Sequence, residues 1–120
     1  MNLHGGGISV RSFIHIKDVV NATLKLAKDG EPGSTWHLST KESISIRALV
    51  EKICKLCNAD FNKIVKISDE RLGKDQNYLL DSSLIRDKFG WIDKTSLDSC
   101  IKETIDWVKD DYELLCKLSW

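Results

Sequence analysis

The fold is decided by the stretch Asp69-Glu-Arg-Leu-Gly-Lys-Asp-Gln-Asn-Tyr-Leu-Leu-Asp-Ser-Ser-Leu-Ile-Arg-Asp-Lys-Phe-Gly-Trp91. Residues 68–79 are polar and show no helical or strand period, which predicts a long loop, and loops of this length tend to carry function. Asp81 or Ser82 can then cap a short helix through Phe89, which Gly90 can close in the left-handed conformation. The stretch therefore predicts a functional loop followed by a capped helix.

Toward the N-terminus, short β-prone runs alternate with amphipathic helices. We expect strands over residues 11–16 and 34–38 and a third β-prone segment at 64–67. Between them we expect a helix from Val19 to Lys28, capped by Asp18, and a helix from Ser45 to about Cys57. One face of the first helix should carry Val20, Leu24 and Ala27, with Val19, Thr23 and Leu26 alongside.

Toward the C-terminus, Ser96 can cap a final helix that can run past Tyr112 to Leu115. Its apolar stripe is Leu97, Ile101, Thr104, Ile105 and Val108. The complete order is strand, helix, strand, helix, strand, helix, helix. This alternation predicts an α/β fold, a small mixed domain with short strands and about four helices.

The composition is that of a globular protein. Of 120 residues, 42% are apolar and 30% are charged, and 18 Lys and Arg balance 18 Asp and Glu. A net charge near zero argues against nucleic acid or a membrane surface as a partner. The apolar runs are far shorter than the roughly 20 residues of a membrane span. The N-terminus lacks the pattern of a secretory signal, so we expect a cytoplasmic protein whose residues 1–120 form a single domain.

Three conspicuous motifs give only weak functional signals. Cys54-Lys-Leu-Cys57 lies at the end of a helix and has no second pair of ligands for zinc, so packing explains it best. Gly5-Gly6-Gly7 precedes a strand, whereas a dinucleotide-binding turn joins a strand to a helix. His4 and His15 are more typical of structural than of catalytic histidines.

The segment Arg71-Leu-Gly-Lys-Asp75 is more informative. Arg71 offers a planar fork of donors and Lys74 a point charge, and both suit the oxygens of a diphosphate. A solvated charged loop is an equally good interpretation of this segment alone. Arg11, isolated among apolar neighbours, is a candidate for a second phosphate contact.

Taken together, these segments resemble the C-terminal third of extended short-chain dehydrogenase/reductases that act on nucleotide sugars, in the NAD-dependent epimerase/dehydratase family. The resemblance covers roughly residues 5–110 and rests on Arg11-Ser-Phe-Ile-His-Ile-Lys-Asp18, Gly33-Ser-Thr-Trp-His-Leu38, the helix from Ser45 and the stretch quoted first. That stretch is similar to the Arg-Pro-Gly-His-Asp, Tyr, Asp and Leu-Gly-Trp pattern of dTDP-glucose 4,6-dehydratases.

The resemblance implies which residues contact the substrate. Arg11 and Arg71 match arginines that contact the nucleotide diphosphate. Lys74 stands where dehydratases usually have a histidine, and His37 where they usually have an asparagine near the nucleotide. Leu72 replaces the usual proline. These three departures leave the base and the sugar open.

The resemblance also implies that this chain is the substrate-binding part of a larger enzyme and lacks its Rossmann core. The family binds NAD on that core and uses a Tyr-x-x-x-Lys pair, but here Ser82 follows Tyr78 and Cys116 follows Tyr112 at that spacing. We therefore expect no catalytic residues and no cofactor in this chain, with NAD in the parent enzyme. The expected partners are a nucleoside diphosphate-sugar and, to cover an exposed apolar patch, either the missing Rossmann domain or a second copy. The alternative is a stand-alone nucleotide-sugar-binding or protein-interaction domain.

Overall fold

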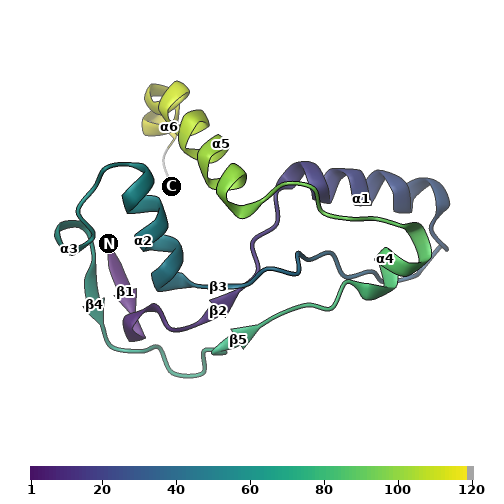
Figure 1. The fold of residues 1–120 in the computed structure, drawn as a ribbon, viewed down its shortest axis with the longest axis horizontal. Coiled ribbons are helices and arrows are strands. Elements are labelled where there is room, and N and C mark those ends of the chain that lie inside the picture. Colours follow the sequence, from purple (N-terminus) through teal and green to yellow (C-terminus); the bar gives the residue numbers. More distant parts are fainter. Residues whose placement is uncertain (119–120) are drawn as a thin grey trace.

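The computed structural model describes residues 1–118, and the chain in it has an open, elongated shape (Figure 1). Its principal extents are 49 × 36 × 27 Å. One end holds α2 (Ile46–Leu56), α3 (Phe61–Ile64) and the strands β1 and β4, and the other holds α1 (Ile16–Asp29) and α4 (Ser83–Phe89). The radius of gyration is 17.1 Å, whereas a compact domain of this length would have about 13.6 Å. The chain therefore leaves much of its surface uncovered.

Two small sheets organise the chain. β1 (Asn2–His4) pairs in parallel with β4 (Lys66–Ser68), with His4 opposite Ser68. The central strand of the second sheet, β2 (Val10–Arg11), lies antiparallel to β3 (Ile44–Ser45) and parallel to β5 (Asn77–Tyr78). In this sheet Arg11 lies opposite Tyr78. Both parallel pairs join segments that are more than sixty positions apart in the sequence.

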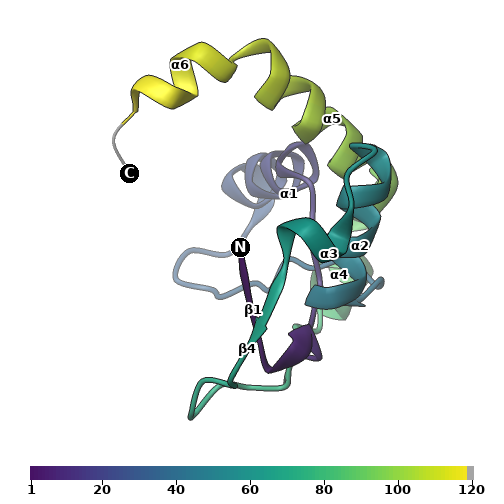
Figure 2. The same ribbon diagram turned by 90° about the vertical axis from the view of Figure 1, so that its left-hand side faces the viewer.

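The four predicted helices are present as α1, α2, α4 and α5 (Leu97–Asp110), which confirms the small mixed α/β fold. Ser45 caps α2 by accepting a hydrogen bond from the Ala48 amide, and Ser96 caps α5 in the same way. Gly90 ends α4 with φ of 60°, in the left-handed region that favours glycine. Two short helices add to the prediction, α3 and α6 (Tyr112–Lys117). α6 extends the last helix after a break at Asp111 and points away from the rest of the chain (Figure 2).

Several local predictions were wrong, and of the strand expected over residues 11–16 only Arg11 lies in a strand, β2 (Val10–Arg11). The N-cap of α1 is His15, whose side chain accepts from the Lys17 amide, because the preceding strand ends early and the helix begins at Ile16. Asp18 therefore lies inside the first turn, where it is buried. Residues 34–38 form no strand, because their apolar side chains Trp36 and Leu38 pack onto the α1–α4 core instead of pairing in a ladder. The third β-prone segment is divided between the end of α3 and β4.

Within residues 1–118, all buried apolar residues except Ile101 fall into two clusters. One comprises Leu3, Val50, Cys54 and Val65, and the other comprises Ala22, Ile85 and Trp91. The predicted centre of the apolar face of α1 is not covered, since Val20 is 46% and Leu24 65% exposed, and the helix buries Ala22 and part of Leu26, which was expected alongside that face. The total accessible surface is 8872 Å², about 2,300 Å² more than the roughly 6,600 Å² expected for a compact monomer of this mass.

Candidate functional site

The pairing of β2 with β5 brings Arg11 against the predicted loop, which is shorter than expected and spans residues 69–76, because Ser68 ends β4 and Asn77–Tyr78 pair as β5. Its Nη2 donates a hydrogen bond of 2.8 Å to the Asp75 carbonyl, and its Nη1 donates one of 3.3 Å to the Gln76 carbonyl. The Val10 amide also donates to the Gln76 carbonyl, at 2.7 Å. Arg11 is therefore half-buried at the base of the loop, and its charge lies beside residues 75–76.

Arg71 and Lys74 lie within the same loop and are both held by neighbours. The Glu70 carboxylate accepts from the Arg71 amide at 3.0 Å and lies 3.7 Å from Nζ of Lys74. The Arg71 Nη2 lies 2.9 Å from Nε2 of His4. The structure thus gathers Arg11, Arg71 and Lys74 around one exposed loop.

His4 is the residue of this site that sequence reasoning missed. The sequence predicts a structural histidine here, because the three histidines are scattered and share no ligand spacing. Its partners Ser68, Asp69 and Arg71 come from the loop that follows β4. Only the parallel pairing of β1 with β4 places them beside it, and the sequence carries no local signal of that pairing.

His37 lies outside the loop that holds Arg71 and Lys74. It is exposed on the segment after α1, in the neighbourhood of Asp81. The amide and hydroxyl of Ser83 hold the pKa of the Asp81 carboxyl below its usual range, and the charge of His37 lowers this pKa further. Leu72 stands at the exposed tip of the loop.

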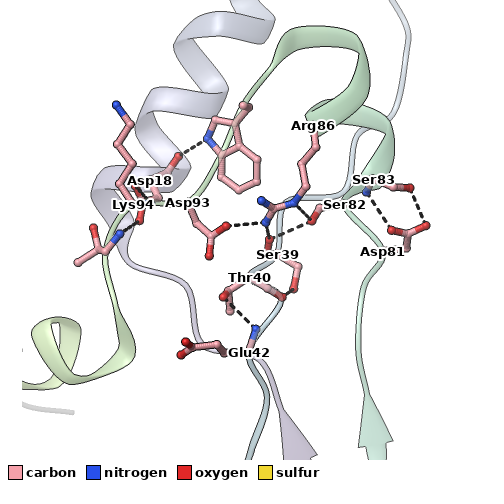
Figure 3. Close-up of polar contacts among 12 residues, drawn as sticks. Asp18, Ser39, Thr40, Glu42, Asp81, Ser82, Ser83, Arg86, Asp93 and Lys94 are labelled. Atoms are coloured by element: carbon pink, nitrogen blue, oxygen red, sulfur yellow. Dashed lines mark hydrogen bonds and ion pairs between the residues drawn. The ribbon is translucent and has the colours of Figure 1, made fainter.

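Residues 82–91, in the second half of the stretch quoted first, contribute to a hydrogen-bonded frame that follows the loop in the sequence (Figure 3). Arg86 of α4 donates to the Ser39 carbonyl at 2.8 Å and to the Asp93 carboxylate at 2.6 Å, and its guanidinium lies 4.9 Å from the centre of the Trp91 ring. Burial would raise the pKa of Asp93, but hydrogen bonds from Arg86 and Thr40 outweigh it and lower the pKa. Arg86 therefore joins α4 to the segment around Ser39 and to residues 91–93.

Asp18 forms the second half of this frame. Its carboxylate accepts hydrogen bonds from the amides of Lys94 at 3.1 Å and Thr95 at 3.0 Å, and its carbonyl accepts one from the Trp91 indole. Burial would raise the pKa of Asp18, but the two amide hydrogen bonds outweigh this effect and the pKa lies below its usual range. Asp18 thus ties α1 to the segment before α5. A hollow of about 380 Å³ lies beside this frame, between residues 40–43 and the start of α4.

The remaining motifs build no site within residues 1–118. No group of three or more possible metal ligands occurs there, and no helix in that range is long and apolar enough to cross a membrane. Cys54 is buried in a core cluster, while Cys57 is exposed, and neither forms a disulfide. Gly5, Gly6 and Gly7 form one turn of 3-10 helix with positive φ at each residue, which precedes β2, and they do not open an α-helix.

The chain is similar to known nucleotide-sugar enzymes. The family model described as GDP-mannose 4,6 dehydratase matches residues 1–104. A trifunctional UDP-glucose 4,6-dehydratase/3,5-epimerase/reductase of Arabidopsis thaliana is 33% identical over 92% of this chain and 16% of its own length. The dTDP-glucose 4,6-dehydratase of Mycolicibacterium smegmatis is 31% identical over 89% of this chain and 32% of its own.

Solved structures share the fold. The dTDP-glucose 4,6-dehydratase DesIV of Streptomyces venezuelae, solved with NAD and TYD, superposes with a TM-score of 0.88 at 23% identity, over 95% of this chain and 35% of that one. The UDP-glucose 4-epimerase of Thermotoga maritima, solved with UDP-glucose, gives 0.83 at 24% identity, over 93% and 35%. This chain thus spans a third or less of the curated relatives named above. With a family match over most of its length, the chain belongs to the GDP-mannose 4,6-dehydratase family of extended short-chain dehydrogenase/reductases.

Proposed function

We propose that this chain is the C-terminal, substrate-binding portion of an NDP-sugar 4,6-dehydratase or a related epimerase/dehydratase. The observation that carries the proposal is the gathering of Arg11, Arg71 and Lys74 around residues 70–76. Two guanidinium groups and an ammonium group can pair with the oxygens of a diphosphate, and the planar guanidinium can do so through two parallel hydrogen bonds. A role for His37 near the base of the nucleotide is a separate part of the proposal.

We infer that the chain binds and orients its ligand but is not catalytic alone. The two tyrosines, Tyr78 and Tyr112, lack a lysine four positions on, so neither matches the family's proton-transfer pair. The glycines at 5–7 lead into a strand, which does not fit the turn that cradles NAD in a Rossmann fold. Redox chemistry in the parent enzyme would therefore depend on residues of another domain, and holding the substrate in place is this portion's contribution.

Binding of UDP and dTDP to the purified chain tests the proposal. Isothermal titration calorimetry should detect binding of either diphosphate and much weaker binding of uridine or thymidine. Arg11→Gln and Arg71→Gln should each weaken binding about tenfold, because each removes a charge-assisted hydrogen bond worth roughly 1.5–3 kcal/mol before solvent screening. Lys28→Gln, an exposed change at the far end of α1, is the matched control. Equal affinity for UDP and uridine would refute the diphosphate site.

We propose further that a Rossmann domain covers the open apolar side of this chain. An apolar cleft of about 660 Å³ lies between α2, α5 and residues 13–16, and Val20 and Leu24 of α1 are exposed. The surplus surface of about 2,300 Å² is larger than the roughly 800 Å² per partner that a standard interface buries. The related solved chains are nearly three times as long as the part that matches.

Light scattering after size exclusion, with an apolar dye, tests this second part. The chain alone should bind the dye or associate with itself, and a separately produced Rossmann domain should abolish both effects. Self-association without any response to the Rossmann domain would favour a second copy as the natural partner. A monomer that binds no dye would refute an exposed interface.

A further inference from the structure

His4 lies at the end of a strand beside the proposed diphosphate site, next to Arg71. It is the last residue of β1, directly opposite the last residue of β4, Ser68. The loop that carries Arg71 leaves β4 at this point. The backbone after β1 turns away from it at Gly5. The half-buried His4 therefore stands between the β1–β4 strand pair and an exposed loop.

The hydrogen-bond partners of the ring determine its chemical state. Nδ1 lies 3.0 Å from the Ser68 hydroxyl and 3.2 Å from the Asp69 carbonyl, and Nε2 lies 2.9 Å from the Arg71 guanidinium. A carbonyl only accepts and a guanidinium only donates, whereas a hydroxyl does either. Nδ1 must therefore carry the proton, and Nε2 must accept from Arg71. Only the neutral ring protonated at Nδ1 satisfies both contacts.

A neutral hydrogen-bond acceptor can orient an arginine without cancelling the positive charge that an anionic ligand would need. A carboxylate in the same place would fix the guanidinium and also compensate its charge. The imidazole fixes one of the five guanidinium donors and leaves the full positive charge uncompensated. The neighbouring carboxylate, Glu70, contacts the Arg71 amide and the Lys74 ammonium.

We propose that His4 is a positioning residue, which in its neutral Nδ1-protonated form holds the Arg71 guanidinium ready for a nucleoside diphosphate. The identity of the ligand rests on the proposed function, whereas the contact between His4 and Arg71 does not depend on it. Pre-ordering this long side chain removes part of the entropy that would otherwise be lost when the ligand binds. His4 makes this contribution without touching the ligand.

Two variants separate positioning from a purely structural role. His4→Gln keeps a side-chain carbonyl that can accept from Arg71, whereas His4→Leu fills similar space without an acceptor. We expect His4→Leu to weaken UDP binding about five- to tenfold and His4→Gln to stay within about threefold of the native chain. In the Arg71→Gln background, His4→Leu should cause no further loss, because the two residues act as one unit. An amide proton–nitrogen spectrum of each variant confirms that it is folded.

A long-range proton–nitrogen spectrum of the imidazole, recorded without ligand, tests the contact directly. The native chain should give the pattern of an Nδ1-protonated ring, and Arg71→Gln should shift the Nε2 resonance while the Nδ1 resonance moves little. An Nε2-protonated ring, or equal losses of UDP affinity from His4→Leu with and without Arg71, would overturn the proposal. If the native chain binds no UDP, the proposed function fails, and the ligand-free spectrum still decides whether His4 holds Arg71.

Discussion

Replacing Asp18 by asparagine should destabilise the chain by about 2.5 kcal/mol, because Asp18 is a buried link between α1 and the segment before α5. Its carboxylate receives two amide hydrogen bonds and its side chain is shielded, with the residue only 2% exposed. Asparagine keeps one acceptor oxygen and turns an NH2 group toward the second amide. One charge-assisted hydrogen bond of about 2 kcal/mol is lost, with about 0.5 kcal/mol from the removal of a negative charge in the first turn of the helix.

Urea unfolding followed by circular dichroism measures this loss. The midpoint should fall with an unchanged slope, and the melting temperature should fall by about 10 °C for a chain of this size. Asp29→Asn, at the exposed end of the same helix, is the matched control and should change the stability by less than about 0.5 kcal/mol. A loss below about 0.5 kcal/mol for Asp18→Asn would refute the structural role assigned to this carboxylate.

The pH dependence of the unfolding free energy tests the role of Asp18 independently. The folded pKa of Asp18 is lowered from 3.8, so the folded chain releases this proton more readily than the unfolded chain does. The stabilisation by Asp18 is therefore complete above pH 3.8 and is lost as the pH falls through the lower, folded pKa. The stability difference between the native chain and Asp18→Asn should be constant at higher pH and shrink below that value. A difference that persists undiminished in strong acid would contradict this account.

Three further outcomes follow from single contacts. Ser45→Ala should lower the unfolding free energy by about 1 kcal/mol, since it removes the acceptor for the Ala48 amide at the start of α2. Ser45→Thr keeps a hydroxyl acceptor and should keep most of this stability, so equal losses for both variants would contradict the cap. Gly90→Ala should cost about 1 kcal/mol in the same urea assay, because alanine is strained at φ of 60°, and an unchanged midpoint would argue against that conformation. Glu70→Gln should tighten UDP binding about threefold in calorimetry, since it removes the carboxylate that competes with the diphosphate for Lys74. Weaker binding would show that Glu70 supports the site.

The sequence alone predicts the features that depend on neighbours along the chain. The caps at Ser45 and Ser96 and the terminator Gly90 are local, since each satisfies or ends the hydrogen bonding of its own helix. The resemblance over roughly residues 5–110 also predicted the family, because motif spacing survives where identity is low. The diphosphate roles of Arg11 and Arg71 came from that resemblance and stay predictions.

Only the tertiary structure decided what depends on segments far apart in the chain. Asp18 looked like a helix cap, yet its partners are the amides of Lys94 and Thr95, 76 and 77 positions away. The helical period of α1 predicted an apolar face, but which face is buried depends on α4 and Trp91, so Val20 and Leu24 remain exposed. Likewise, no local pattern reveals that β1 pairs with β4 and delivers His4 to Arg71. Local preferences set the elements, while long-range pairing set the site, because pairing depends on which distant surfaces meet.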